Sequence, residues 1–186
     1  MSSIGFCGKS YDIPSGYFAV ATRAVTAGVP NLNRDYFPPE VLEDATKTYI
    51  DCPRVFVDHR TDFDDTNPHL DKTFSRGYVK DAVYEDGVLY LLIFVSKKFK
   101  DLAEALISGE INAVSMGCEC SITCSICGEE DCPHLEKLAE GYLEDDNYEI
   151  LSDVEFVEIS FVFEPADPTA LIYKVVTFCN SELCIL

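Results

Sequence analysis

The sequence has no long apolar segment and few basic residues. No run of about 18 apolar residues occurs, so no membrane-spanning helix is predicted. Lys and Arg number only 14 against 33 Asp and Glu, which gives a formal net charge of −19. Because no basic cluster is present, we expect no binding to nucleic acid or to an anionic membrane surface. The sequence also has no internal repeat, no low-complexity tract and no signal-peptide pattern at its start.

The composition indicates one globular domain that spans residues 1–186. The chain is 47% hydrophobic and contains twelve Phe and ten Tyr, enough to build a sizeable core. Its nine cysteines are odd in number, and five of them lie shortly before His134 in the sequence. This pattern favours a reducing compartment and a bound metal over disulfides, so we expect a cytoplasmic protein.

The hydrophobic pattern predicts an α+β fold in which strands outnumber helices. Asp86-Gly87 between two β-rich segments is a strong hairpin signal. One helix is expected after Pro38-Pro39, and another with Ser96 as its N-cap and Gly109 as its end. Since no βαβ alternation is visible, we expect a mostly antiparallel, barrel-like sheet with flanking helices. The predicted strands cover residues 17–25, 54–58, 77–85, 88–95, 111–118, 154–163 and 171–178.

Three side chains of complementary chemistry lie in or beside these strands. Ser115 is a lone hydroxyl among small and apolar residues, His59 ends a short strand, and Glu158 lies inside an apolar run. A serine, a histidine and a carboxylate together form an acyl-transfer set, whatever their order in the chain. The sequence therefore predicts Ser115 as nucleophile, His59 as general base and Glu158 as the carboxylate that orients the imidazole.

Each of these residues also has a structural interpretation. Ser115 is compatible with a small core residue, His59 with a surface histidine, and Glu158 with a buried carboxylate bonded to backbone or arginine. His69 competes for the role of base, although it lies in an acidic loop that would hold it poorly. Asp153 and Glu155 are weaker alternatives to Glu158 because they lie at the more polar start of its strand.

A cysteine-rich insert, residues 118–137, follows the Ser115 strand. Within it Cys124, Cys127, Cys132 and His134 form a complete tetrahedral ligand set, which predicts one structural zinc per chain and no metal in catalysis. Reactive thiols are the alternative. Cys118 and Cys120 are either spare ligands or core residues. We expect the zinc clip to lie next to Ser115 and to fix where its strand ends.

Four segments resemble the prohead proteases of tailed bacteriophages, which mature the capsid and are related in fold to the herpesvirus assembly protease. The match extends from about Tyr17 to Ala170, and its most specific part is Glu-Ile-Ser followed by Pro-Ala-Asp-Pro. The resemblance assigns the histidine, the nucleophile and the acid to His59, Ser115 and Glu158. The segments begin at Phe56, Arg76, Val114 and Val157.

The resemblance implies a serine endopeptidase that cleaves scaffold and capsid proteins inside the assembling prohead, in the host cytoplasm. A homo-oligomer is compatible with this interpretation. The alternative from another class is a non-enzymatic capsid or scaffold component that keeps the fold and the structural zinc. A zinc hydrolase is a third interpretation, but clustered thiolates oppose the open metal position that it requires.

Overall fold

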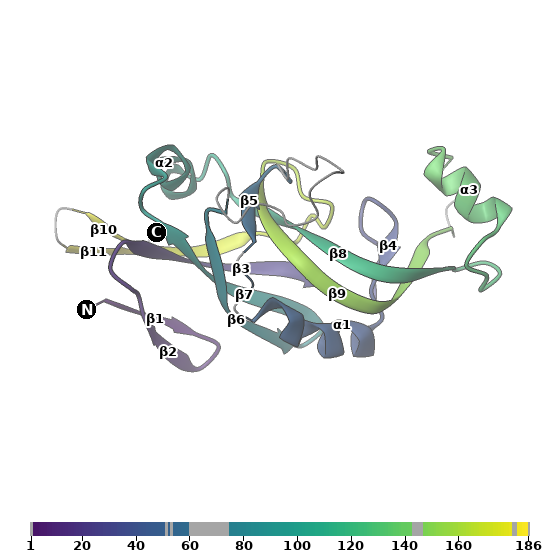
Figure 1. The fold of residues 1–186 in the computed structure, drawn as a ribbon, viewed down its shortest axis with the longest axis horizontal. Coiled ribbons are helices and arrows are strands. Elements are labelled where there is room, and N and C mark those ends of the chain that lie inside the picture. The colour runs from purple at the N-terminus through teal and green to yellow at the C-terminus, as the bar shows by residue number, and fades with distance from the viewer. Residues whose placement is uncertain are drawn as a thin grey trace.

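The computed structural model describes residues 2–50, 52, 54–59, 75–142, 147–179 and 182–185. In these residues two larger sheets and one small hairpin carry most of the chain, and short helices flank them (Figure 1). The hairpin is formed by β1 (Ser3–Phe6) and β2 (Lys9–Asp12).

The first large sheet is five-stranded, with the order β11-β10-β3-β7-β6 and antiparallel neighbours throughout. The predicted hairpin is confirmed: Asp86 and Gly87 connect β6 to β7 with φ values of 51° and 78°, the left-handed conformation that such a turn requires. The strands are β3 (Tyr17–Thr26), β6 (Gly77–Glu85), β7 (Val88–Ser96), β10 (Ile172–Cys179) and β11 (Glu182–Ile185).

The second sheet is built around the long strand β9 (Glu149–Val162). Strand β8 (Ala113–Cys124) runs antiparallel along one edge of β9. Two short strands pair with β9 in parallel on its other edge, β4 (Asp35–Tyr36) near its start and β5 (Val55–Val57) near its end. This parallel pairing places Val57, the end of β5, opposite Phe161, three residues after Glu158 on β9.

The two sheets share one apolar core. Alternate residues of β7, including Leu91 and Ile93, pack in one cluster with Val114 of β8 and Ile159 of β9. The intervening residues Leu92 and Phe94 point to the opposite face, where the β1–β2 hairpin covers a second, smaller cluster. Strand β7 is therefore buried on both faces, which explains its nearly continuous apolar sequence.

Three α-helices flank the sheets in the described part of the chain. Helix α1 (Pro39–Ala45) begins at the Pro pair, continues as a 3-10 turn (Thr46–Tyr49), and packs against β9. Helix α2 (Lys100–Ser108) ends at Gly109, whose φ of 77° confirms the predicted C-cap. Helix α3 (Pro133–Ala139) follows the cysteine cluster.

The fold differs from the sequence predictions in several elements. The expected barrel does not close in the described residues, where the strands form separate sheets. The two large sheets are linked on one side by a bridge between Ala113 and Leu171, and on the other by the backbone bond from the Arg76 N–H to the Val55 carbonyl oxygen. Ser96 is the last residue of β7 and does not cap α2, which begins after Phe99. Five short elements were not predicted, because each has too few residues to show a clear period in its hydrophobic pattern. They are strands β1, β2, β4 and β11 and helix α3.

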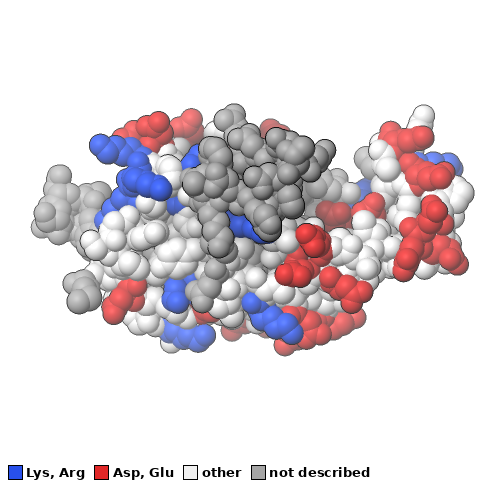
Figure 2. Space-filling view, in the orientation of Figure 1, with Lys and Arg blue, Asp and Glu red and all other residues white. Residues whose placement is uncertain are grey.

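The surface charge is unevenly distributed. In the view of Figure 2, Asp and Glu gather over the end that carries α3 and over the side that carries α1, whereas basic side chains lie around the start of α2. Among the described residues, no helix is both long and apolar enough to cross a bilayer.

Candidate active site

Glu158 is a buried carboxylate on β9, with 7% of its side chain exposed. It faces Gly117 of β8, its partner in the strand register. A Cβ atom at position 117 would lie 2.6 Å from Glu158 Oε1, so any residue larger than glycine would displace the carboxylate. Gly117 therefore creates the space that this carboxylate occupies.

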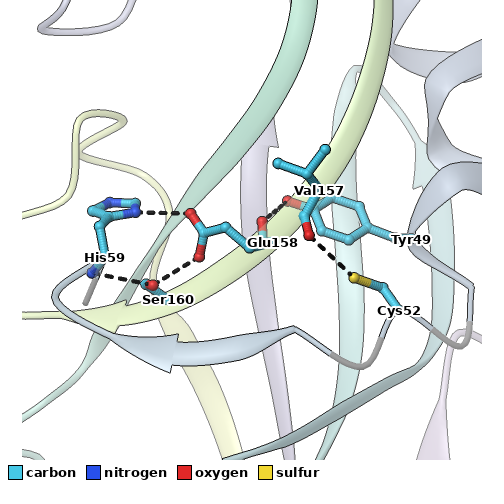
Figure 3. A network of polar contacts seen from close by, with 6 residues as sticks. All are labelled: Tyr49, Cys52, His59, Val157, Glu158 and Ser160. Carbon is cyan, nitrogen blue, oxygen red and sulfur yellow. Dashed lines mark hydrogen bonds and ion pairs between the residues drawn. The ribbon is translucent and has the colours of Figure 1, made fainter. Parts of the chain in front are cut away.

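Side chains of the preceding 3-10 turn and of Cys52 contact the backbone around Glu158. The Tyr49 hydroxyl donates to the Glu158 carbonyl oxygen at 3.1 Å, and the Cys52 thiol lies 3.6 Å from the carbonyl oxygen of Val157 (Figure 3). Tyr49 is fully buried and stacks on Phe156. These contacts anchor β9 to the 3-10 turn, so the strand that carries the carboxylate is part of the rigid core.

His59 meets this carboxylate from the end of β5. Its Nδ1 lies 2.8 Å from Glu158 Oε1, although the two residues are 99 positions apart in the chain (Figure 3). The hydrogen bond to Glu158 raises the pKa of His59, the charges of Glu158 and Asp58 add to this effect, and burial opposes it. With Nδ1–H donated to the carboxylate, Nε2 is the basic nitrogen of the neutral ring.

Ser115 lies near the start of β8 and is half-buried. Its side chain and that of His59 line the same pocket, which has a volume of about 250 Å³. The pocket walls come from the end of β3, the chain around β4, β8, and the loop after β9. The structure thus brings all three predicted residues to one place: His59 and Glu158 by a direct bond, and Ser115 by a shared cavity.

Ser160 is a further residue of this site that sequence reasoning did not identify as functional. Its hydroxyl donates to Glu158 Oε2 at 2.8 Å and accepts from the backbone N–H of His59 at 3.2 Å (Figure 3). The residue is fully buried, so its hydroxyl is not accessible to a substrate. The alternation of a strand was the available signal, because it places residues 158 and 160 on one face of β9.

The competing candidates lie in less suitable places. Asp153 and Glu155 are both exposed on the earlier part of β9. Cys118 and Cys120 are partly buried and pack against the main core. Burial raises the pKa of Cys118 to about 12, with a smaller contribution from Cys120, so this thiol is a poor source of thiolate. His69 lies outside the described residues.

The cysteine cluster has the geometry of a metal centre. The ligand atoms of Cys124, Cys127, Cys132 and His134 all lie within 4.8 Å of one another. Zinc–sulfur bonds of about 2.3 Å place tetrahedral ligands roughly 3.8 Å apart, so the four donors fit such an ion with small adjustments. Gly128, with φ of 76°, supplies the left-handed residue of the turn after Cys127. These residues lie close enough together to bind a metal ion.

The sequence suggested that the cysteine cluster lies beside Ser115. The structure places it elsewhere. Residues 118–124 continue β8, and Cys124 is the last residue of that strand. At about 3.3 Å per strand residue, Cys124 lies roughly 30 Å along β8 from Ser115. The cluster does mark the end of the strand, but at the end opposite to the pocket, next to α3 (Figure 1).

Comparison with solved structures finds a similar fold in a phage capsid protease. No protein-family model matches the sequence, and no curated protein matches it significantly. Among solved structures, the chain is similar to the bacteriophage T4 capsid assembly protease, gp21, with a TM-score of 0.56 and 17% sequence identity. The similarity covers 78% of this chain and 81% of the T4 chain. At this identity the similarity establishes the fold.

Proposed function

We propose that this protein is a serine endopeptidase that cleaves scaffold and capsid proteins during maturation of a phage prohead. The observation that carries the proposal is the 2.8 Å bond between His59 Nδ1 and Glu158 Oε1, at a pocket also lined by Ser115. The fold of a capsid assembly protease supports the same function. A proteolytic role accounts for a buried carboxylate that faces a half-exposed imidazole.

In the proposed mechanism Ser115 Oγ attacks the scissile carbonyl carbon. His59 Nε2 accepts the hydroxyl proton and then delivers it to the leaving amine. Glu158 stays ionised, accepts the Nδ1–H bond and stabilises the imidazolium that forms. Water, deprotonated by the same imidazole, hydrolyses the acyl-enzyme and regenerates Ser115.

The test is to incubate the purified protein with the scaffold and capsid proteins encoded in the same genome, and to sequence the new termini. In parallel, a fluorophosphonate probe should label the peptide that contains Ser115. Cleavage at defined sites together with labelling supports the proposal. An inert protein that neither cleaves nor reacts, yet assembles into proheads, would instead support the non-enzymatic capsid component.

Replacing Glu158 with glutamine should lower kcat by about 10²- to 10⁴-fold with little change in KM. The amide keeps the volume of the side chain but lacks the charge that stabilises imidazolium. Glu155→Gln is the matched control, since Glu155 is exposed on the same strand. Steady-state kinetics on one cleaved substrate, with melting curves of both variants, measure the effect. Equal activity of Glu158→Gln and wild type would remove Glu158 from the mechanism.

We further propose that the metal is zinc and that its role is structural. Four protein donors fill a tetrahedral site and leave no position for water, which separates this centre from a zinc hydrolase. The short, polar segment between Cys124 and His134 buries little apolar area, so coordination would supply much of the energy that orders it.

Replacing Cys127 with serine should abolish stoichiometric metal binding and lower the melting temperature, while the cleavage sites stay the same. Cys127 is exposed, so the change removes a ligand without opening a hole in the core. Cys7→Ser, at another exposed cysteine, is the control. Metal analysis should give about one zinc per chain for wild type and control. A metal-free wild type with the same melting temperature as the loaded protein would contradict the structural role.

A further inference from the structure

Ser160 lies at the junction of the three strands that build the site. In the strand register, Ser160 on β9 pairs with Ser115 on β8 and with Phe56 on β5. The strand that carries the proposed nucleophile and the strand that ends in the proposed base are therefore both aligned on this position. Its side chain is completely buried, where a small apolar residue would fill the same space.

The Ser160 hydroxyl contacts both partners of the histidine–carboxylate pair. It donates its proton to Glu158 Oε2 at 2.8 Å, and its oxygen accepts from the His59 backbone N–H at 3.2 Å. Glu158 therefore has one oxygen on the His59 ring and the other on Ser160, while Ser160 also holds the backbone of the same histidine (Figure 3). The three groups form a closed ring of contacts, which restricts rotation of the carboxylate.

The turn that carries His59 needs such support. Asp58 and His59 both have positive φ values, 53° and 47°, a conformation that non-glycine residues adopt rarely. Two contacts from β9 hold it: the Asp58 N–H donates to the Phe161 carbonyl oxygen at 3.0 Å, and the His59 N–H donates to Ser160 Oγ. Of these two acceptors, the Phe161 oxygen belongs to the backbone and the Ser160 oxygen to a side chain. A substitution can therefore remove the Ser160 contact alone.

We infer that Ser160 is a positioning residue: its hydroxyl fixes the carboxylate and the left-handed turn relative to each other, so that the His59 ring meets Glu158 in the productive orientation. This inference rests on the proposed serine protease function. It also gives a physical role to the serine of the Glu-Ile-Ser segment, which the sequence alone did not explain.

The kinetic test is Ser160→Ala. We expect kcat to fall by about 10²-fold with KM nearly unchanged, because misplacement of a catalytic group acts on the chemical step. The acid limb of the pH profile should also move to lower pH, since a looser carboxylate raises the pKa of His59 less. Among the described residues, the charges of Glu158 and of Asp58 in its own turn act on the imidazole, and Asp35 and Asp167 line the same pocket. None of these is changed by the substitution.

Two variants separate positioning from a general effect on folding. Ser160→Thr keeps the hydroxyl and should recover most of the lost kcat. Ser152→Ala removes a hydroxyl from the same strand, far from the pocket, and should leave both kcat and the pH profile unchanged. A Ser160→Ala enzyme with wild-type kcat and an unmoved acid limb would overturn the inference. So would a Ser160→Thr enzyme with a wild-type melting temperature that is as slow as Ser160→Ala.

A second measurement does not depend on catalysis. In the Ser115→Ala background, NMR titration of the three histidines gives the pKa and tautomer of His59 directly. We expect the pKa of His59 to fall toward its ordinary value when Ser160→Ala is added. If wild type cleaves nothing but this shift is seen, the protease proposal fails and the positioning role stands. If wild type cleaves but Ser160→Ala changes neither the pKa nor the tautomer of His59, the positioning role is wrong and the protease proposal stands.

Discussion

Replacement of Ser115 with alanine is expected to reduce cleavage by at least about 10⁴-fold without loss of the fold. The change removes one oxygen from a half-buried side chain and opens no large cavity. Two other candidate nucleophiles among the described residues are poorly suited to attack: Ser160 is fully buried, and burial raises the pKa of the Cys118 thiol to about 12. Gel-based cleavage assays, circular dichroism and melting curves measure the two parts of this prediction.

Ser121→Ala provides the matched control for Ser115→Ala. Ser121 lies on the same strand but is exposed, and its replacement should leave cleavage unchanged. Residual activity of Ser115→Ala within tenfold of wild type, at an equal melting temperature, would rule out Ser115 as nucleophile. Cys118 and Cys120 would then be the next candidates to replace.

Replacement of His59 with alanine is expected to have the second large effect, a loss of about 10⁴-fold or more in kcat. In wild type, only the neutral imidazole can accept the serine proton, so activity should fall as pH drops through the pKa of His59. The hydrogen bond to Glu158 raises this pKa from its ordinary value of 6.5. The acid limb of the kcat/KM profile should therefore have its midpoint above 6.5.

Kinetics between pH 5 and pH 9 on one substrate measure this limb. His69→Ala is the control and should keep both the rate and the profile of wild type. A flat profile between about pH 5 and pH 8 would exclude an imidazole base. A midpoint below 6.5 would contradict the close His59–Glu158 bond as the state of the active enzyme.

Much of the local structure was predictable from the sequence because its causes are local. Asp86-Gly87 specifies a tight hairpin by the left-handed conformations that these residues tolerate, and Gly109 ends α2 for the same reason. The clustering of the four candidate metal ligands was predictable because their spacing in a short segment already limits how far apart they can lie. Short strands such as β4, with two residues, carry too few positions to show a pattern.

The distance between the cysteine cluster and Ser115 could not be predicted from their separation in the sequence. The cysteines follow Ser115 in sequence, and proximity in the chain suggested proximity in space. In an extended strand, however, each residue adds about 3.3 Å, so nine positions place the cluster at the far end of β8. A helix of the same length would have kept the two features much closer together.

The sequence by itself determined which side chains were available: a histidine at a strand end, a carboxylate in an apolar run, a serine among small residues, and four clustered soft ligands. Only the tertiary structure decided that β5 pairs with β9 in parallel, which brings His59 to Glu158 across 99 positions. It also decided that Gly117 makes room for this carboxylate and that Ser160 holds it. Strand register depends on the packing of the whole sheet, and local preferences do not specify it.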